Sequence, residues 1–303
     1  MIFFQVLAVK VPVSNGNQTG GVGATDYYGV LEHSIEARDV QHSGWNFLSP
    51  SSFITLSFWI KSSVAQVFSG SIELPDSSSI KFFKFDTPSL SADTWTKVTK
   101  TIPGNSNLDV DDNTNAGLII RLYAYIGTTY TSSNSDTETW VSGSNRYANT
   151  MASTWYTTND ATCEITGVQL EVGSQATAFE HRSFGEELAL CQRYFFTVRG
   201  NNQQRTNIPA FANSTTACRA MVSFPTPMRA TPTFSGSSTN MVFDSSDDSA
   251  TFLCSALQQG GVMTNDSPHG MLIEVSTSSM TAGQAGVLEF RANGGELNFS
   301  AEI

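Results

Sequence analysis

The chain has 303 residues, of which 40% are hydrophobic, 11% aromatic and only 14% charged, and its formal net charge is -11. A hydrophobic fraction of this size, recurring in short runs, predicts a folded protein rather than a disordered one. The acidic balance argues against binding to nucleic acid or to an anionic membrane surface, and no apolar run is long enough to insert into a membrane.

Alternating apolar and polar residues predict a series of β-strands over the first 180 residues. The first ten residues lack the basic start and the cleavage site of a signal peptide, so we expect a strand there. In 54–60 the apolar side chains share one face, and Trp59 falls on the other face, where we expect it to be half-exposed. The remaining predictions are strands at 64–74, 80–85, 94–102 and 118–126, and loops at 15–23 and 39–50, whereas the mixed periodicity of 27–36 leaves strand and helix open.

Two different patterns follow each other between residues 161 and 196. Residues 165–172 alternate, and Gly167 interrupts the period once, as a β-bulge does. This predicts the last strand of a β-sandwich, with apolar side chains inward. Glu186 and Glu187 then open a short run that Arg193 closes, and this distribution of charge favours a short helix or turn.

These patterns predict an all-β protein, in which an antiparallel jelly-roll β-sandwich is followed by a second, small antiparallel β domain. We place the first domain at 1–180, a connector at 181–196 and the second domain at 197–303. Within the second domain, Asn293 and Gly294 favour a hairpin. A polar loop is expected at 199–207, and strands are expected at 217–224, 241–243, 251–257, 271–275, 287–291 and 297–303.

The segments 165–173 (ITGVQLEVG), 176–182 (ATAFEHR) and 186–194 (EELALCQRY) resemble a connector found in many bacteriophage virion proteins. These are tail-fibre, appendage and head-fibre proteins, which carry a jelly-roll domain like a carbohydrate-binding module before the connector. Residues 53–63 and 94–104 resemble strands of that domain, and 222–233 and 281–286 resemble the module after the connector. The similarity covers most of the chain from about residue 25 onward.

The resemblance implies a structural protein of the virion that is assembled in the host cytoplasm, commonly as a homotrimer in contact with other tail or capsid proteins. The leading hypothesis is an exposed fibre or tail-appendage subunit that attaches to a host-surface glycan through its first domain. A capsid decoration or head-fibre protein with a structural role is the alternative. A glycan depolymerase is a further alternative, and it would need two carboxylates roughly 5–10 Å apart across a cleft.

Aromatic residues set among Ser, Thr, Asn and Gly form the candidate glycan site. Sugar rings present C–H faces that stack on aromatic rings, and their hydroxyls pair with polar side chains. The alternative interpretation is that the same rings cap the sandwich or pack between subunits. The candidates are Tyr130, Trp140, Tyr147, Trp155 and Tyr156.

The acidic stretch 109–115 is the candidate metal site, because carboxylates and amides in a loop can bind calcium. Its spacing departs from that of an EF-hand, with Thr114 where glycine is needed and Ile120 where the bidentate glutamate should be. We therefore favour a solvated acidic turn and expect no cofactor. The ligands of the calcium alternative would be Asp109, Asp111, Asp112, Asn113 and Asn115.

The remaining chemistry-bearing residues point away from an enzyme. No serine-hydrolase elbow, P-loop, dinucleotide fingerprint or zinc-protease motif is present in the sequence. The carboxylates Glu171, Glu180, Glu186 and Glu187 exist, but the sequence does not place two of them across a cleft. We also expect the cysteines to be buried reduced thiols, because they are widely spaced; they are Cys163, Cys191, Cys218 and Cys254.

Overall fold

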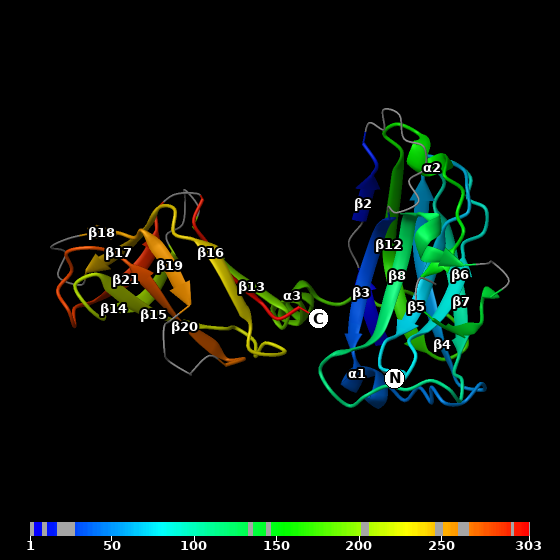
Figure 1. Ribbon diagram of the computed structural model, residues 1–303, viewed down its shortest axis with the longest axis horizontal. Coiled ribbons are helices and arrows are strands. Elements are labelled where there is room, and N and C mark those ends of the chain that lie inside the picture. Colours follow the sequence, from blue (N-terminus) through cyan, green and yellow to red (C-terminus); the bar gives the residue numbers. More distant parts are fainter. Residues whose placement is uncertain are drawn as a thin grey trace. The chain divides into compact units, whose positions relative to one another are not determined.

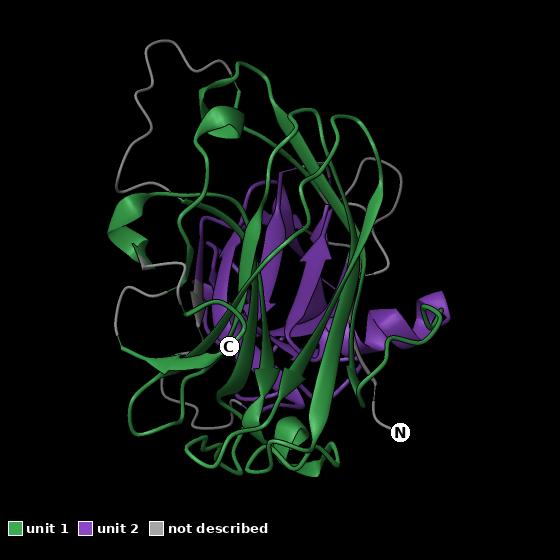
Figure 2. Ribbon diagram, turned by 90° about the vertical axis from the view of Figure 1, so that its right-hand side faces the viewer, with its two compact units in different colours: residues 1–181 green, residues 182–303 purple. Residues whose placement is uncertain are grey.

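The computed structural model describes residues 3–7, 11–16, 28–132, 136–143, 147–200, 206–245, 251–259, 267–291 and 294–302. Every named sheet but a two-stranded one is antiparallel, so the protein is all-β, as the sequence predicts. The chain divides into two compact units, residues 1–181 and 182–303, coloured separately in Figure 2.

The first unit contains two five-stranded sheets. One sheet has the order β1-β12-β4-β7, with β2 also paired to β12, and the other has the order β10-β6-β5-β8-β3 (Figure 1). The strands of the first sheet are β1 (Phe3–Leu7), β2 (Val11–Ser14), β4 (Phe53–Ser62), β7 (Thr96–Pro103) and β12 (Thr162–Val172). Those of the second are β3 (Tyr28–Glu36), β5 (Ser69–Leu74), β6 (Lys81–Asp86), β8 (Ala116–Ile126) and β10 (Trp140–Ser142).

The order of these strands is that of a jelly roll. With β1 and β2 counted together and the short strands after β8 omitted, one sheet contains the first, eighth, third and sixth strands. The other contains the second, seventh, fourth and fifth. This order is the double Greek key of the jelly roll, and it confirms the predicted fold of this unit.

Short elements complete the first unit. A parallel pair is formed by β9 (Thr131–Ser132) and β11 (Ala148–Asn149), and it follows the single-turn helix η1 (Thr128–Tyr130). Two further short helices are α1 (Ala37–His42) and α2 (Thr154–Thr157). The predicted loop at 39–50 thus begins within a helix, because Ala37 and Val40 turn inward and are buried.

The core of the first unit lies between its two sheets, and β4 shows why the sequence pattern predicts it. Ile54, Leu56 and Phe58 are buried in this core, and burying each side chain contributes about 1.5–3 kcal/mol. Trp59 points to the opposite face and is 41% exposed, as predicted. The alternation of the strand therefore separates the core from an outer face.

β12 contains the predicted bulge. Gly167 has φ +60°, and the pairing of β12 with β4 shifts register between Thr166 and Gln169. A Cβ atom on Gly167 would lie 3.3 Å from the indole of Trp59, so glycine fits both the backbone conformation and the space.

The second unit opens with the predicted helix, α3 (Phe184–Gln192). Ser183 caps it, since its hydroxyl accepts from the Glu186 amide and the Glu186 carboxylate accepts from the Ser183 amide. The hydrogen bonds that the Ser183 amide and hydroxyl donate to the Glu186 carboxylate hold the pKa of Glu186 below its usual value. The helix therefore begins at Phe184, directly after its cap, and the two acidic residues lie in its first turn.

Two sheets follow α3, with the orders β13-β22-β16 and β18-β17-β21-β14-β15-β20-β19. The small sheet consists of β13 (Phe195–Arg199), β16 (Thr233–Ser237) and β22 (Glu296–Ser300). The large sheet consists of β14 (Thr206–Ala212), β15 (Ala217–Ser223), β17 (Met241–Ser245), β18 (Thr251–Leu253), β19 (Ala256–Gln259), β20 (Gly270–Ser276) and β21 (Ala285–Phe290).

The large sheet curls until its two outer strands approach each other. β18 and β19 lie at opposite edges, yet only Cys254 and Ser255 separate them in the chain. The Cys254 amide donates to Met241 O at 3.0 Å, and the Ser255 amide donates to Ser276 O at 2.9 Å. Because the three Cα–Cα steps from Leu253 to Ala256 span at most about 11 Å, the sheet must curl strongly enough to bring these two strands together.

Several predicted boundaries in the sequence are wrong. β5 begins at Ser69 rather than at 64, and the single strand predicted at 251–257 is two strands at opposite edges of the large sheet. The predicted polar loop at 199–207 overlaps β13 and β14. The sequence pattern also missed β16, whose Ser and Gly residues give no apolar alternation.

Two further predictions fail. Asn293 lies outside the described residues, but β21 and β22 on either side of the predicted hairpin belong to different sheets, so they do not pair. The four cysteines are free thiols, and Cys191 is exposed rather than buried. The other three are buried as expected, and burial, together with the nearby Glu164 carboxylate, raises the pKa of Cys163 to about 12.

Candidate functional site

The outer face of the sheet β10-β6-β5-β8-β3 carries the candidate site. On β8, the alternating residues Leu118, Ile120 and Leu122 face the core, so Arg121 and Tyr123 point outward. Antiparallel pairing with β3 puts Glu32 opposite Arg121 and Val30 opposite Tyr123. These last four side chains form the floor of the site.

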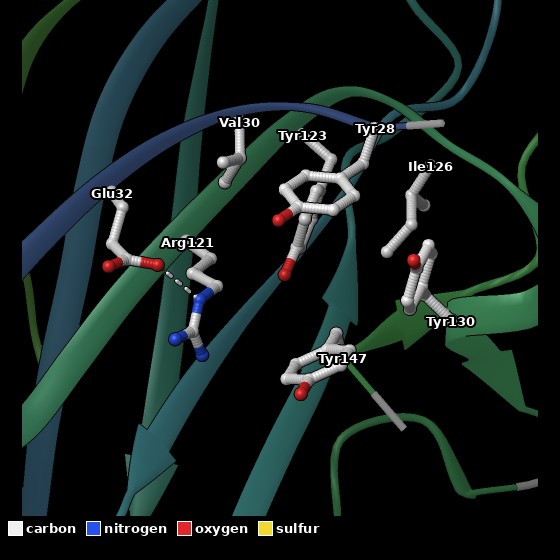
Figure 3. A pocket seen from close by; sticks show the side chains of 8 residues that line it. All are labelled: Tyr28, Val30, Glu32, Arg121, Tyr123, Ile126, Tyr130 and Tyr147. Atoms are coloured by element: carbon white, nitrogen blue, oxygen red, sulfur yellow. Dashed lines mark hydrogen bonds and ion pairs between the residues drawn. The ribbon is translucent and has the colours of Figure 1, made fainter. Parts of the chain in front are cut away.

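Tyrosines from three segments enclose a pocket of about 180 Å³ above this floor. Tyr28 begins β3, Tyr130 ends η1, and Tyr147 precedes β11. Figure 3 shows the rings around one space, with Arg121 and Glu32 beside them. The lining residues are Tyr28, Val30, Glu32, Arg121, Tyr123, Ile126, Tyr130 and Tyr147.

The tyrosine rings contact one another at their edges. The ring centroids of Tyr28 and Tyr130 are 5.3 Å apart, and the planes of these two rings are nearly perpendicular. The ring centroids of Tyr130 and Tyr147 are 6.2 Å apart. Tyr147 also packs on Phe82, and the guanidinium of Arg121 lies 5.4 Å from its ring centroid. Tyr28 and Tyr130 meet edge to face and Tyr130 and Tyr147 are tilted by 55°, so neither pair is stacked face to face.

Ion pairs hold Arg121 in place. Its Nε donates to Glu32 Oε2 at 2.6 Å, and its Nη1 donates to Glu73, which lies on β5. Burial lowers the pKa of Arg121, but the hydrogen bond and charge of Glu73, with a further contribution from Glu32, raise this pKa overall. Burial also raises the pKa of Tyr123 far above its ordinary value. At neutral pH the pocket therefore holds a charged guanidinium beside an uncharged Tyr123 phenol.

The structure brings two of the five aromatic candidates into this pocket, Tyr130 and Tyr147. Trp140 packs on Phe83 at 5.5 Å, and its Nε1 donates to Pro103 O at 2.7 Å. It therefore lies at the edge of the core.

The other two candidates also lie away from the pocket. Trp155 is only 3% exposed and belongs to the core, where its backbone amide donates to Gln66. Tyr156 stacks on Tyr125, with centroids 4.4 Å apart and planes at 20°. These rings serve packing, which was the alternative interpretation for the whole set.

Tyr28 and the four residues of the pocket floor are not among the candidates that the sequence suggests. Arg121 and Tyr123 interrupt the apolar run of β8 at alternating positions, and that pattern marks an outward-facing polar pair. The juxtaposition with Glu32 depends on the pairing register of β3 and β8, which the sequence does not give.

The acidic stretch 109–115 forms a hydrogen-bonded turn. The Asp111 amide donates to Asp76, and the Asn113 side chain donates to Asp111. The Asn115 amide in turn donates to Asn113, and Asp112 forms an ion pair with Arg38 at 3.4 Å. Among the described residues, no group of three or more His, Cys, Asp or Glu side chains is placed to hold a metal ion.

The carboxylates named as catalytic candidates have structural contacts. Glu171 accepts from the amide of Thr177 at 3.0 Å and from its hydroxyl, and Glu186 caps α3. Glu187 forms an ion pair with Arg182 at 3.5 Å. Within the described part of the chain, no helix is long and apolar enough to cross a membrane.

Comparison with known proteins gives no family. No family model matches the sequence, and no curated protein matches it. One solved structure, of a Parabacteroides distasonis protein predicted to be secreted, aligns over 96% of this chain and 88% of its own. Its sequence identity is 9% and the TM-score is 0.22, a likeness too low to bear on function.

Proposed function

We propose that the chain is a structural subunit of a bacteriophage virion, an exposed fibre or tail appendage whose first unit binds a host-surface glycan without cleaving it. The observation that carries the binding role is the tyrosine-lined pocket on the outer face of the jelly roll. The virion role rests on the resemblance of residues 165–194 to the connector of such proteins.

The lining of the pocket matches the chemistry of a sugar ring. Aromatic rings can stack against the C–H faces of a sugar, while phenol hydroxyls and the Glu32 carboxylate can form hydrogen bonds with its hydroxyls. The volume of about 180 Å³ is below the 300–1,000 Å³ usual for larger small-molecule ligands. A single sugar unit, at the end or on a branch of a polysaccharide, is the ligand that fits.

The arrangement of the carboxylates near the pocket supports the part of the proposal that the glycan is bound but not cleaved. Glycoside hydrolysis uses two carboxyl groups on either side of the scissile bond. Glu32 lines the pocket and Glu73 is buried on β5, but both bind the same guanidinium of Arg121 instead of facing each other across the open space. A depolymerase would require a different arrangement.

A glycan array tests the binding role, using the wild-type chain, Tyr28→Ala and Trp59→Ala. Tyr28 is 57% exposed at the pocket, and Trp59 is 41% exposed on the opposite sheet, so each change removes an exposed aromatic ring. We expect Tyr28→Ala to weaken binding at least tenfold, about 1.4 kcal/mol, and Trp59→Ala to leave it unchanged. Absence of binding by the wild type, or equal loss in both variants, contradicts the proposal.

The position of the chain on the virion distinguishes a tail fibre or appendage from a capsid decoration or head-fibre protein. Immunogold labelling of intact virions with an antibody against residues 206–302 would place gold on tail tips or side fibres. Gold spread over the head would instead support the structural alternative. Gold absent from purified particles would remove the virion role altogether.

A further inference from the structure

We infer that the pocket selects neutral or amine-bearing sugars and rejects sugars that carry a carboxylate, such as uronic and sialic acids. This inference rests on the proposed sugar-binding function and adds the charge class of the ligand. It depends on which charged groups a ligand in the pocket meets, and on which of them are already paired.

Arg121 is the group that would bind an acidic sugar, but two of its three nitrogens already donate to carboxylates of the protein. An arginine recognises a carboxylate best when two parallel N–H groups point at both oxygens. Here Nε donates to Glu32 and Nη1 donates to Glu73, and the ring of Tyr147 lies over the guanidinium. A ligand carboxylate would have to share the guanidinium with two carboxylates of the protein, Glu32 and Glu73.

The exposed charge in the pocket is negative. The side chain of Glu32 is 44% exposed, whereas those of Arg121 and Glu73 are 13% and 7% exposed. Of the charged groups that line the pocket, the carboxylate of Glu32 is therefore the more exposed. An acidic sugar is repelled by this carboxylate, while hydroxyl and ammonium groups can donate hydrogen bonds to it.

Lys84 does not reverse this balance. Pairing of β8 with β5 and of β5 with β6 places it in the same row as Arg121, with Ser71 between them. It is fully buried, and it is not among the residues that line the pocket. Its ammonium group therefore is not presented to a bound sugar.

Tyrosine rings provide the second reason for the preference. The faces of tyrosine rings carry the negative side of the aromatic quadrupole, and the exposed ring of Tyr28 can present it to the C–H groups of a sugar and to any ammonium group, whereas Arg121 already lies over the ring of Tyr147. The same faces repel an anion. The rings and Glu32 therefore favour the same class of ligand.

The experiment measures binding of the full chain to immobilised neutral, amino and uronic-acid forms of glucose, galactose and mannose. Each series keeps the ring and changes only the charged group. We expect the acid to bind at least tenfold more weakly than its neutral parent, and the amino sugar to bind as well or better. An acid bound as tightly as its neutral parent overturns the selectivity and leaves the proposed function standing.

Glu32→Gln tests the origin of the selectivity, because it removes the exposed charge and frees Arg121 Nε. The expected result is a difference between acid and neutral sugar of less than threefold. Glu296→Gln is the matched control, since Glu296 pairs with Arg199 Nε across neighbouring strands of the second unit and is 38% exposed. Glu296→Gln should retain the tenfold difference in affinity between acidic and neutral sugar. If both variants lose this difference equally, or if Glu32→Gln retains it, the assignment of the selectivity to Glu32 is overturned.

Salt gives a test that needs no variant. Raising the ionic strength screens repulsion between exposed charges, so binding of the acid by the wild type should strengthen while that of the neutral sugar stays constant. A uronic acid whose binding weakens with salt would be attracted to the pocket, which contradicts the inference. If the wild type binds no sugar in any series, the proposed function fails and the inference fails with it.

Discussion

Single aromatic side chains in the first unit have three kinds of surroundings. Trp155 is buried in the core, Trp59 stands on the outer face of β4, and Tyr28 borders the pocket. Exposing a ring forgoes hydrophobic stabilisation, while burying Trp155 leaves its indole Nε1 without a hydrogen-bond partner among the described residues. The consequences of removing each ring therefore differ.

Trp155→Ala should destabilise the first unit by about 3–5 kcal/mol, because the truncation leaves a cavity in the core. Chemical denaturation of the purified chain measures the change. Trp155→Phe should cost much less, since it keeps most of the volume and removes the unpaired N–H. Sugar binding per folded molecule should be unchanged in both variants, and a selective loss of binding would mean that Trp155 belongs to the site.

His33 predicts a dependence of stability on pH. It lies opposite the buried Ile120, and burial lowers its pKa below 6.5 in the folded chain. As the pH falls below about 6.5, the unfolded chain takes up a proton that the folded chain does not, so the free energy of unfolding decreases by at most about 1.4 kcal/mol per pH unit.

Denaturation of the wild type and of His33→Gln between pH 7.5 and roughly 5 tests this dependence. The variant should lose less stability than the wild type on acidification. His42→Gln, at an exposed position on α1, is the matched substitution measured alongside it. A His33→Gln slope equal to that of the wild type contradicts the assignment to His33.

Only some of the individual residues of the pocket could be predicted from the sequence. Tyr130 and Tyr147 could be named because aromatic residues in polar loops are typical of sugar sites. Trp140 and Trp155 belong to the same sequence neighbourhood, but their direction relative to the core depends on where β10 and α2 pack. Arg121, Glu32 and Tyr28 come from strands whose register only the folded sheet defines.

Individual elements depend on local geometry, and the bulge of β12 is the clearest case. Gly167 combines φ +60° with a close approach to Trp59. Gly185 in α3 has no neighbouring atom within 4 Å of an added Cβ and no positive φ. These two glycines provide a matched pair of substitutions.

Gly167→Ala should destabilise the first unit by about 1–2 kcal/mol, because alanine resists the left-handed conformation. Gly185→Ala should be neutral or stabilise α3 by up to about 1 kcal/mol, since alanine is the better helix former. Denaturant titrations of the two variants measure both changes. A Gly167→Ala protein as stable as the wild type would show that the bulge does not require glycine.

Elements with strong alternation or capping were predictable. The alternating apolar positions predict β4 and β8, and the acidic residues predict the first turn of α3, without reference to the rest of the fold. β16 and the short β9 and β11 were not predictable, because their pairing comes from neighbours rather than from their own residues. The same reason explains the failed hairpin, whose flanking strands find partners in different sheets.

The whole molecule consists of two units with separate cores. Leu56 is buried in the first core, and Phe299 is buried in the second. Compact units with their own cores can unfold as separate cooperative transitions.

Leu56→Ala should lower the stability of the first unit by about 2–5 kcal/mol, and Phe299→Ala should lower that of the second by about 3–5 kcal/mol. Differential scanning calorimetry should show two unfolding transitions. Leu56→Ala should shift one of them to lower temperature, and Phe299→Ala should shift the other. A single transition shifted equally by both substitutions would mean that the units unfold together.

At this scale the central claim is that the tyrosine pocket of the first unit binds the host-surface glycan. NMR spectra of the chain with ¹³C-labelled Tyr and Trp rings, titrated with polysaccharide from the host surface, test it most directly. We predict shifts of the Tyr28, Tyr130 and Tyr147 rings, with Trp59 and Trp155 unchanged. Unchanged tyrosine spectra at saturating polysaccharide, or shifts confined to Trp59, would contradict the claim.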